Sequence, residues 1–239
     1  MREKVLRNWY KRVIYDDEHW TLLRLKREKA VKILELLDEN NIKAYLYGSL
    51  ARGDVKKTSD IDIIIFTPPP AYRLEYIIEE AFGRIYAREI VQATPRHAIK
   101  AHIYIDPETI ITFPLTPLNN LEQEFYKFGG IIDLARARNY KNRVPGVDKR
   151  LVLIIPRDDG HVEYSIIGRE EEVAKMLGIS IDIVKERIYV LTRRDQIGRT
   201  GVFIKRVLSP DESFDTVLRE LESKNPAVRR LIKSRGVII

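Results

Sequence analysis

Apolar residues recur with helical spacing in some segments of the chain and form short alternating or continuous runs in others. The helical spacing predicts helices over residues 20–40, 71–82 and 118–128, with charged side chains mostly off the apolar stripe. The shorter runs predict strands, because alternating and β-branched residues fit a pleated surface that is buried on one or both faces. These strands cover residues 42–47, 60–66, 89–93, 98–105, 110–113 and 151–155. Strands and helices therefore alternate along most of the chain.

A different pattern occupies the C-terminal part of the chain. In residues 170–189, small or apolar residues stand where a helix-turn-helix needs them, and Gly178 supplies the turn conformation. Ser180 is a sound N-cap for the second helix. This segment resembles the DNA-binding helix-turn-helix family, with one departure at Arg187, which stands at a usually apolar position. Residues 196–207 predict a hairpin, so we expect a winged form of this domain.

These patterns divide the chain into three parts. We expect an N-terminal helical segment at residues 1–40, a central domain at 41–157 and a helix-turn-helix-like domain at 158–239. The second boundary is placed in the segment 156–160, which follows the last predicted strand and contains turn residues.

Composition narrows the class of protein. The 239 residues are 44% hydrophobic and 32% charged, a mixture typical of an ordered chain. Cysteine is absent, which excludes a disulfide framework, a thiolate metal site and a cysteine nucleophile. No apolar run approaches the ~20 residues that span a bilayer. Residues 1–15 lack the apolar centre of a signal peptide, so we expect a cytoplasmic protein.

The charge balance points to the kind of partner. A net charge of +7 favours polyanions such as nucleic acid or nucleoside triphosphate. The abundance of Lys, Arg and Glu also fits the charge-rich surface of a thermophile protein, and the two interpretations are compatible.

The most informative stretch follows the strand at residues 42–47. Gly48 and Ser49 come directly after it and precede a predicted short helix. Glycine lets the backbone approach a phosphate closely, and the hydroxyl and the helix amides can then hold the phosphate oxygens. Arg52 can pair with phosphate or with nearby carboxylates, and Gly53 permits the tight turn out of the helix.

Two carboxylates belong to the next strand. Alternate residues of a strand share a face, so Asp60 and Asp62 point the same way. They repel each other unless a cation lies between them. Magnesium prefers such hard oxygen ligands and leaves room for phosphate oxygens. The pair is therefore a natural half of a two-metal site, which activates an attacking hydroxyl and stabilises a leaving pyrophosphate.

In this order and spacing, these residues resemble the polymerase-beta-like nucleotidyltransferase superfamily, especially its small archaeal and bacterial members. The resemblance implies an α/β (α+β) core, a mixed β-sheet with flanking helices. It also implies dependence on Mg²⁺ (or Mn²⁺) and transfer of a nucleoside monophosphate from an NTP to a hydroxyl. It assigns the metal to Asp60 and Asp62. Four further residues are assigned to the nucleotide, Gly48, Ser49, Arg52 and Ser59.

The family usually places a third carboxylate on a later strand. The candidate strand, residues 98–105, has His102 at its polar middle position instead. Asp106 shares the face of His102 by the two-residue period and stands at the strand end, while Glu89 is a poorer third choice. Either Asp106 serves as the catalytic acid, or His102 replaces it as ligand or base, or the site is inactive.

The predicted helix-turn-helix supplies candidate nucleic-acid contacts, because a row of basic residues can face phosphates. These are Lys185, Arg193, Arg194 and Arg199. We therefore expect an NTP-using enzyme whose hydroxyl acceptor is associated with nucleic acid. Two alternatives stay open: a DNA-binding regulator or antitoxin-like protein with a degenerate transferase fold, and a transferase that acts on a small molecule or a protein hydroxyl.

Overall fold

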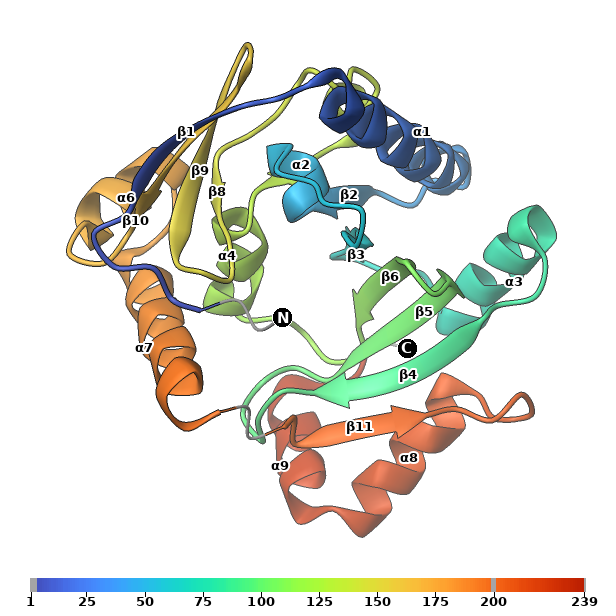
Figure 1. The fold of residues 1–239 in the computed structure, drawn as a ribbon. Helices are drawn as coiled ribbons and strands as arrows, with labels where there is room; N and C mark the ends of the chain where they lie inside the picture. Colours follow the sequence, from blue (N-terminus) through green and yellow to red (C-terminus); the bar gives the residue numbers. More distant parts are fainter. Residues whose placement is uncertain (1–3, 199–200, 239) are drawn as a thin grey trace. The chain divides into compact units, whose positions relative to one another are not determined.

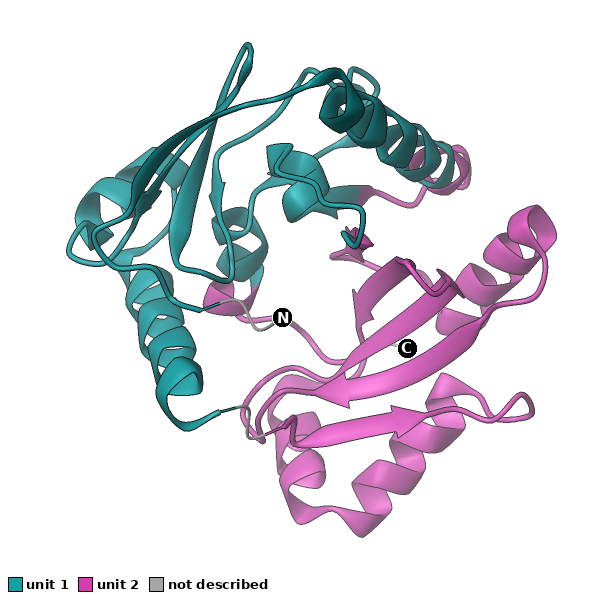
Figure 2. Cartoon of the chain, in the orientation of Figure 1, with its two compact units in different colours: residues 1–33, 45–59, 123–200 teal, residues 34–44, 60–122, 201–239 magenta. Residues whose placement is uncertain are grey.

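The computed structural model describes residues 4–198 and 201–238 (Figure 1). The chain forms two compact units that interleave along the sequence (Figure 2). Unit 1 contains residues 1–33, 45–59 and 123–200, and unit 2 contains residues 34–44, 60–122 and 201–239. Each unit is assembled from three segments of the chain, and three of the five boundaries fall inside α1 (Asp17–Glu39), β2 (Ala44–Tyr47) and α4 (Asn120–Phe128).

Unit 1 contains an antiparallel sheet with the strand order β1-β10-β9-β8. Its strands are β1 (Tyr10–Ile14), β8 (Gly146–Val147), β9 (Val152–Arg157) and β10 (Gly160–Ser165). The predicted apolar run at 151–155 forms β9, and its first residues are fully buried. β1 is an edge strand that the sequence pattern did not indicate, so the segment 1–40 holds a strand before its helix. The expected boundary after residue 157 falls inside a hairpin, because Arg157 pairs with Gly160.

The rest of unit 1 contains the Gly-Ser turn and the helix pair. Strand β2 pairs antiparallel with the short β7 (Ile131–Ile132), and α2 (Ser49–Arg52) follows β2 directly. Other helices of this unit are α5 (Leu134–Ala137), α6 (Glu170–Leu177) and α7 (Ile181–Ile197). Gly178, in the left-handed conformation with φ of 62°, ends α6 at the predicted turn, and α7 follows it.

Unit 2 contains a mixed sheet in which β11, β4, β5, β6 and β3 lie in that order. Its strands are β3 (Ile61–Ile65), β4 (Ala87–Gln92), β5 (Lys100–Asp106), β6 (Thr109–Pro114) and β11 (Ile204–Val207). β3 pairs parallel with β6, and the other neighbours are antiparallel. Its other helices are α3 (Ala71–Phe82), α8 (Phe214–Lys224) and α9 (Pro226–Arg235). The mixed sheet with helices confirms the expected α/β class for this part of the chain.

One face of this sheet is the core of unit 2. Ile103 and Ile111 are opposite each other in register and completely buried. On the same face, the ring of Phe113 meets Phe214 of α8 edge-on at 5.5 Å between centroids. Arg88, also on this face, donates to Glu75 of α3 at 2.8 Å. Helices α3 and α8 therefore cover this face, and the opposite face carries the polar residues described below.

The prediction of a winged hairpin is wrong. Residues 204–207 form β11, which pairs antiparallel with β4 at the edge of the sheet in unit 2. The preceding helix α7 continues through Ile197, into the segment where the hairpin was expected to begin. The alternating pattern that predicted a wing thus encodes an edge strand with a distant partner. Among the helices of the described residues, none is long and apolar enough to cross a membrane.

Candidate active site

The paired carboxylates lie on the polar face of the sheet in unit 2. Asp62 stands opposite Ile110 of β6, which stands opposite Tyr104 of β5, so these side chains share one face. Asp60 comes two residues before Asp62, immediately before β3 begins, and its side chain is exposed. The residues between them and after them, Ile61 and Ile63, are buried on the opposite face. The register places Asp62 on this face, and the same orientation for Asp60, which precedes the strand, stays a prediction.

Three further polar residues share this face. Glu89 of β4 is directly opposite His102 of β5, and His102 is opposite Thr112 of β6. Tyr104 is two residues after His102 on the same strand, so it points the same way. We call Asp60, Asp62, Glu89, His102 and Tyr104 the carboxylate face.

Tyr104 interacts with the three acids of the carboxylate face. Its hydroxyl donates a hydrogen bond of 3.1 Å to Oε2 of Glu89. Burial, then Glu89, then Asp60 and Asp62 raise the pKa of Tyr104 to about 12. The phenol therefore stays protonated at neutral pH, in the combined field of three carboxylates. Sequence reasoning missed Tyr104, although its place two residues after His102 was a usable signal.

Glu89 is the best-held acid of this face. Its side chain is buried, and besides the bond from Tyr104 it forms an ion pair of 3.3 Å with Lys205 of β11. Lys205 is a partner of Glu89 because β11 pairs with β4 at the edge of the sheet. Glu89 is therefore better placed than the sequence indicated.

Burial favours the neutral form of His102. Burial, with Lys100 and Lys205 adding to it and Glu89 opposing it, lowers the pKa of His102 to about 4. Its Nδ1 atom is buried and finds no hydrogen-bond partner among residues 4–198 and 201–238. A histidine with such a low pKa is a weak base at neutral pH, but its neutral ring can still accept a hydrogen bond.

Asp106 does not share the carboxylate face, contrary to the two-residue period. The register shifts between Tyr104 and Asp106, so that Asp106 pairs with Thr109. Thr109 in turn pairs with Ile61, which lies on the buried face. One Asp106 oxygen accepts a 3.0 Å hydrogen bond from the amide of Glu108, in the turn between β5 and β6. The extra residue of this bulge reverses the expected orientation.

The Gly-Ser turn is built in unit 1. Gly48 has φ of 80°, a left-handed conformation that suits glycine, and its amide donates to Gly130 O at 2.9 Å. Gly53, with φ of 100°, ends α2 in the same way. Ser49 is half-buried, and none of the described residues forms a hydrogen bond with its hydroxyl. The hydroxyl is thus free to bind a phosphate oxygen.

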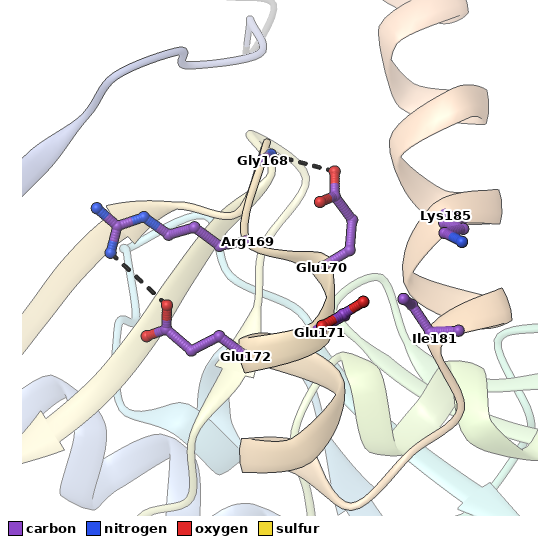
Figure 3. Close-up of a pocket in the computed structure, with 7 residues that line it drawn as sticks. All are labelled: Gly168, Arg169, Glu170, Glu171, Glu172, Ile181 and Lys185. Carbon is purple, nitrogen blue, oxygen red and sulfur yellow. Dashed lines mark hydrogen bonds and ion pairs between the residues drawn. The ribbon is translucent and has the colours of Figure 1, made fainter.

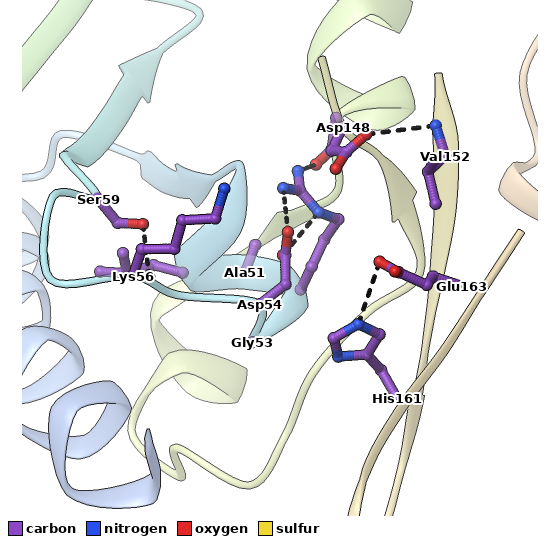
Figure 4. Close-up of polar contacts among 12 residues, drawn as sticks. Ala51, Gly53, Asp54, Lys56, Ser59, Asp148, Val152, His161 and Glu163 are labelled. Atoms are coloured by element: carbon purple, nitrogen blue, oxygen red, sulfur yellow. Dashed lines mark hydrogen bonds and ion pairs between the residues drawn. The ribbon is translucent and has the colours of Figure 1, made fainter. Parts of the chain in front are cut away.

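Arg52 is committed to the turn itself. Its guanidinium forms a bidentate pair with Asp54, at 2.9 Å for both bonds, and donates to Gly129 O at 2.6 Å. Burial acts to lower the pKa of Arg52, but Asp54, with smaller contributions from Asp148 and Tyr15, outweighs it, so the net shift is upward. Figure 4 labels Asp54 and Asp148, the two carboxylates that act on the Arg52 guanidinium. Arg52 therefore fixes the turn and has few donors left for a phosphate.

Ser59 also serves the local structure. Its hydroxyl accepts a 2.9 Å hydrogen bond from the amide of Lys56, and its carbonyl accepts one of 2.7 Å from Lys26 Nζ (Figure 4). These bonds close the loop that leads to Asp60. The expected contact of Ser59 with the nucleotide stays a prediction.

The helix pair α6–α7 places the expected nucleic-acid residues. Lys185, Arg193 and Arg194 are exposed on α7, whereas Arg199 lies outside the described residues. A pocket of about 480 Å³ lies at the start of the two helices. Figure 3 shows its lining, in which Lys185 faces a row of acids. Its other lining residues are Gly168, Arg169, Glu170, Glu171, Glu172 and Ile181.

The first turn of α7 packs inward. Ser180 occupies the N-cap position, but its hydroxyl donates to Glu124 of α4 at 2.5 Å instead of capping the helix. Arg187 lies over the ring of Phe125 at 5.1 Å, and burial lowers its pKa. The side of α7 that departs from the usual apolar pattern is thus used for packing against α4.

Comparison with known protein families agrees with the geometry of the carboxylate face and of the Gly-Ser turn. Residues 27–130 match the family model of the nucleotidyltransferase domain. This domain begins at Arg27 of α1 and ends at Gly130, whose carbonyl accepts from Gly48. The match supports nucleotidyl transfer from an NTP as the general function. No curated protein and no solved structure matches the chain. The helix pair α6–α7 lies outside the matched residues.

Proposed function

We propose that the chain is a metal-dependent nucleotidyltransferase that transfers a nucleoside monophosphate from an NTP to a hydroxyl acceptor. The observation that carries this proposal is the pair Asp60 and Asp62 on one sheet face, within a nucleotidyltransferase domain. In this reaction the acceptor oxygen bonds to the α-phosphorus, the bond to pyrophosphate breaks, and the acceptor loses its proton.

The two carboxylates fit Mg²⁺ or Mn²⁺. Magnesium is commonly held by one or two carboxylates together with substrate phosphates and waters. Within the described residues, no group of three or more His, Cys, Asp or Glu side chains could hold a metal ion alone. Phosphate oxygens and water would therefore complete the ligand set of Asp60 and Asp62. The bound ion would neutralise charge that develops on the phosphates.

Other residues of the chain would hold and orient the substrates. We assign the triphosphate to the Gly48 turn and the free hydroxyl of Ser49, with Arg52 as the residue that fixes the turn. Tyr104 directs its proton to Glu89, so the lone pairs of its oxygen are available to a substrate hydroxyl. This arrangement supports Tyr104 and Glu89 as positioning residues in place of Asp106. Neutral His102 would accept a hydrogen bond on the same face.

We propose nucleic acid as the carrier of the acceptor hydroxyl. Lys185, Tyr189 and Arg193 are exposed and recur every four residues, so they follow one side of α7. Basic residues interleaved with an aromatic ring suit a nucleic-acid strand. The acids Glu170 to Glu172 and Asp182 surround the start of this helix, which favours contact along its later turns. A regulator with a degenerate transferase fold is the alternative, and absence of any transfer would support it.

The experiment incubates the protein with each labelled NTP, Mg²⁺ or Mn²⁺, and separate pools of RNA, DNA, protein and small-molecule hydroxyls. The variant Asp60→Asn/Asp62→Asn should lose both transfer and Mn²⁺-NTP binding by calorimetry. Its melting temperature should equal or exceed that of the wild type, because the change relieves repulsion between like charges. Asp211→Asn, an exposed acid of the same unit, is the control and should behave as the wild type. Unchanged Mn²⁺-NTP binding in the double variant would remove the proposal.

A further inference from the structure

Arg27 of α1 is a buried cation without a counterion. Its side chain is 1% exposed, and its closest hydrogen bonds go to main-chain carbonyls, Leu50 O at 2.6 Å from Nε and Asn142 O at 3.0 Å from Nη2. Longer contacts reach Ala51 O and Ala137 O, at 3.4 and 3.3 Å. No carboxylate of the described residues pairs with it. Burial, helped by the charge of Arg143, lowers the pKa of Arg27 to about 10.

Arg143 is a second cation of the same kind in unit 1. Its guanidinium donates to Gly160 O at 2.7 Å and to Arg157 O. The guanidinium carbon lies 4.8 Å from the centre of the Trp20 ring, and the aliphatic part of the side chain packs against Gly53. Like Arg27, it forms no ion pair within the described residues.

These two charges lie behind the Gly-Ser turn. Arg27 binds the carbonyls of Leu50 and Ala51, which follow Ser49 directly in α2, and Arg143 packs where α2 ends. Arg52, the third arginine of this group, is balanced by Asp54. Arg143 also interacts with the carboxylate of Asp159, so Arg27 is the arginine of this group whose charge no carboxylate of the described residues offsets.

A buried charge without a counterion carries a desolvation cost that hydrogen bonds to carbonyls offset only in part. The charge therefore needs a reason beyond packing. An anion bound at the Gly-Ser turn would supply such a reason. The helix α2 has four residues and is only about 6 Å long at 1.5 Å per residue, so an anion at its start would lie close to Arg27. Attraction over such a distance is screened little by salt when one charge is buried.

We infer that Arg27 is a positioning residue for a polyphosphate chain, whose negative charge its guanidinium attracts toward the Gly48–Ser49 turn from within the protein. Arg143 adds to the same field. The inference rests on the proposed function for the site, but it concerns binding of the polyphosphate and not the transfer step. It predicts that the contribution of Arg27 grows with the number of phosphate charges.

The test separates the charge of Arg27 from its hydrogen bonds. Arg27→Gln keeps hydrogen-bonding capacity and removes the charge, whereas Arg27→Lys keeps the charge and loses the fork of donors. We expect Arg27→Gln to weaken binding of tripolyphosphate roughly tenfold, and binding of a nucleoside monophosphate much less. Arg27→Lys should retain most of the affinity, although both variants should melt at a lower temperature. Arg24→Gln, on an exposed side of the same helix, is the matched control and should bind as the wild type.

Equal affinity of Arg27→Gln and wild type for tripolyphosphate would overturn the inference, and so would an equal loss in Arg27→Gln and Arg27→Lys. Should Arg27→Gln fail to fold, Arg143→Gln tests the same field at a half-buried position, with an expected loss of about threefold. Calorimetry with tripolyphosphate requires no transfer. A protein that binds it in this charge-dependent way but transfers no nucleotide would keep the inference and lose the proposed enzyme.

Discussion

His102 makes the stability of the fold depend on pH in a window that the structure defines. Three charged groups act on its ring: Lys100 of the same strand β5, Glu89 of β4 and Lys205 of β11. Burial and the two lysines disfavour the imidazolium, and Glu89 only partly compensates. The perturbation that tests this is His102→Gln, which keeps a polar side chain of similar length but cannot gain a proton.

The magnitude follows from the pKa of His102 in the two states. It is 6.5 in the unfolded chain and about 4 in the folded one, which at 1.36 kcal/mol per factor of ten corresponds to about 3 kcal/mol. The unfolded state binds a proton below pH 6.5 that the folded state refuses. The contribution is therefore fully present above pH 6.5 and is lost progressively as the pH falls toward 4.

Urea unfolding from pH 8 to pH 4.5 measures this effect as the difference between the wild type and His102→Gln. We expect the free energy of unfolding of the wild type to fall by up to about 3 kcal/mol more than that of the variant across this range. Acidic groups titrate in both proteins and cancel in the difference. NMR titration of the imidazole resonance that disappears in the variant supplies an independent pKa. A midpoint near 6.5, or parallel stability curves, would refute the buried and unpartnered position of His102.

Two further predictions concern the substrates. Tyr104→Phe and Glu89→Gln should each lower kcat/KM for transfer roughly tenfold, the equivalent of one hydrogen bond to a charged group. Asp106→Asn should leave kcat/KM unchanged. A larger effect of Asp106→Asn than of the other two variants in transfer assays would reverse the assignment. Replacing Arg193 and Arg194 with Ala should reduce the slope of log K against log salt for single-stranded nucleic acid by up to about 1.4. An unchanged slope in fluorescence titrations would move the nucleic-acid contact away from α7.

The local elements of the fold were predictable because their signals are local. The helix expected at residues 71–82 is α3 with the same bounds, since its apolar spacing and the preceding prolines are both read within one segment. The strand that holds Asp62 was equally clear, because a β-branched run next to alternating acids has few other uses. The face shared by the two carboxylates follows from strand geometry alone.

The elements that failed depend on partners far away in the chain. β1 is mostly exposed and polar, and it becomes a strand only through pairing with β10, about 150 residues later, as in Tyr10 with Tyr164. The buried Glu163 of β10 is held by Trp9 and Arg150, which no periodicity reveals. Figure 4 shows Glu163 and His161 directed toward each other in this network, at 3.5 Å. A polar residue can be buried wherever such partners meet it, so its strand does not look apolar.

The difference between local signals and distant partners also explains why the sequence ranked Asp106 above Glu89. Asp106 was favoured by a period that assumes an uninterrupted strand, and a single extra residue near the turn reversed it. Glu89 was ranked lower because nothing near it in the sequence marks it. Its importance depends on Tyr104 and Lys205, which reach it from two other strands.

The pattern in residues 170–189 predicted two helices with a turn at Gly178, and the structure has α6 and α7 there, while the assignment to a DNA-binding family stays a prediction. Val173, Ala174 and Val184 are buried as the pattern requires, and Gly178 forms the turn. Yet Ser180 bonds Glu124 of α4, so the start of α7, which would read bases in a DNA-binding domain, is held inside unit 1. Arg187 was the signal in the sequence, since a cation at an apolar position needs a special partner, and here the ring of Phe125 supplies it. The contact that we propose with nucleic acid therefore uses the outer side of α7, where Tyr189 and Arg193 are exposed, which suits stacking and phosphate binding better than base reading in a groove.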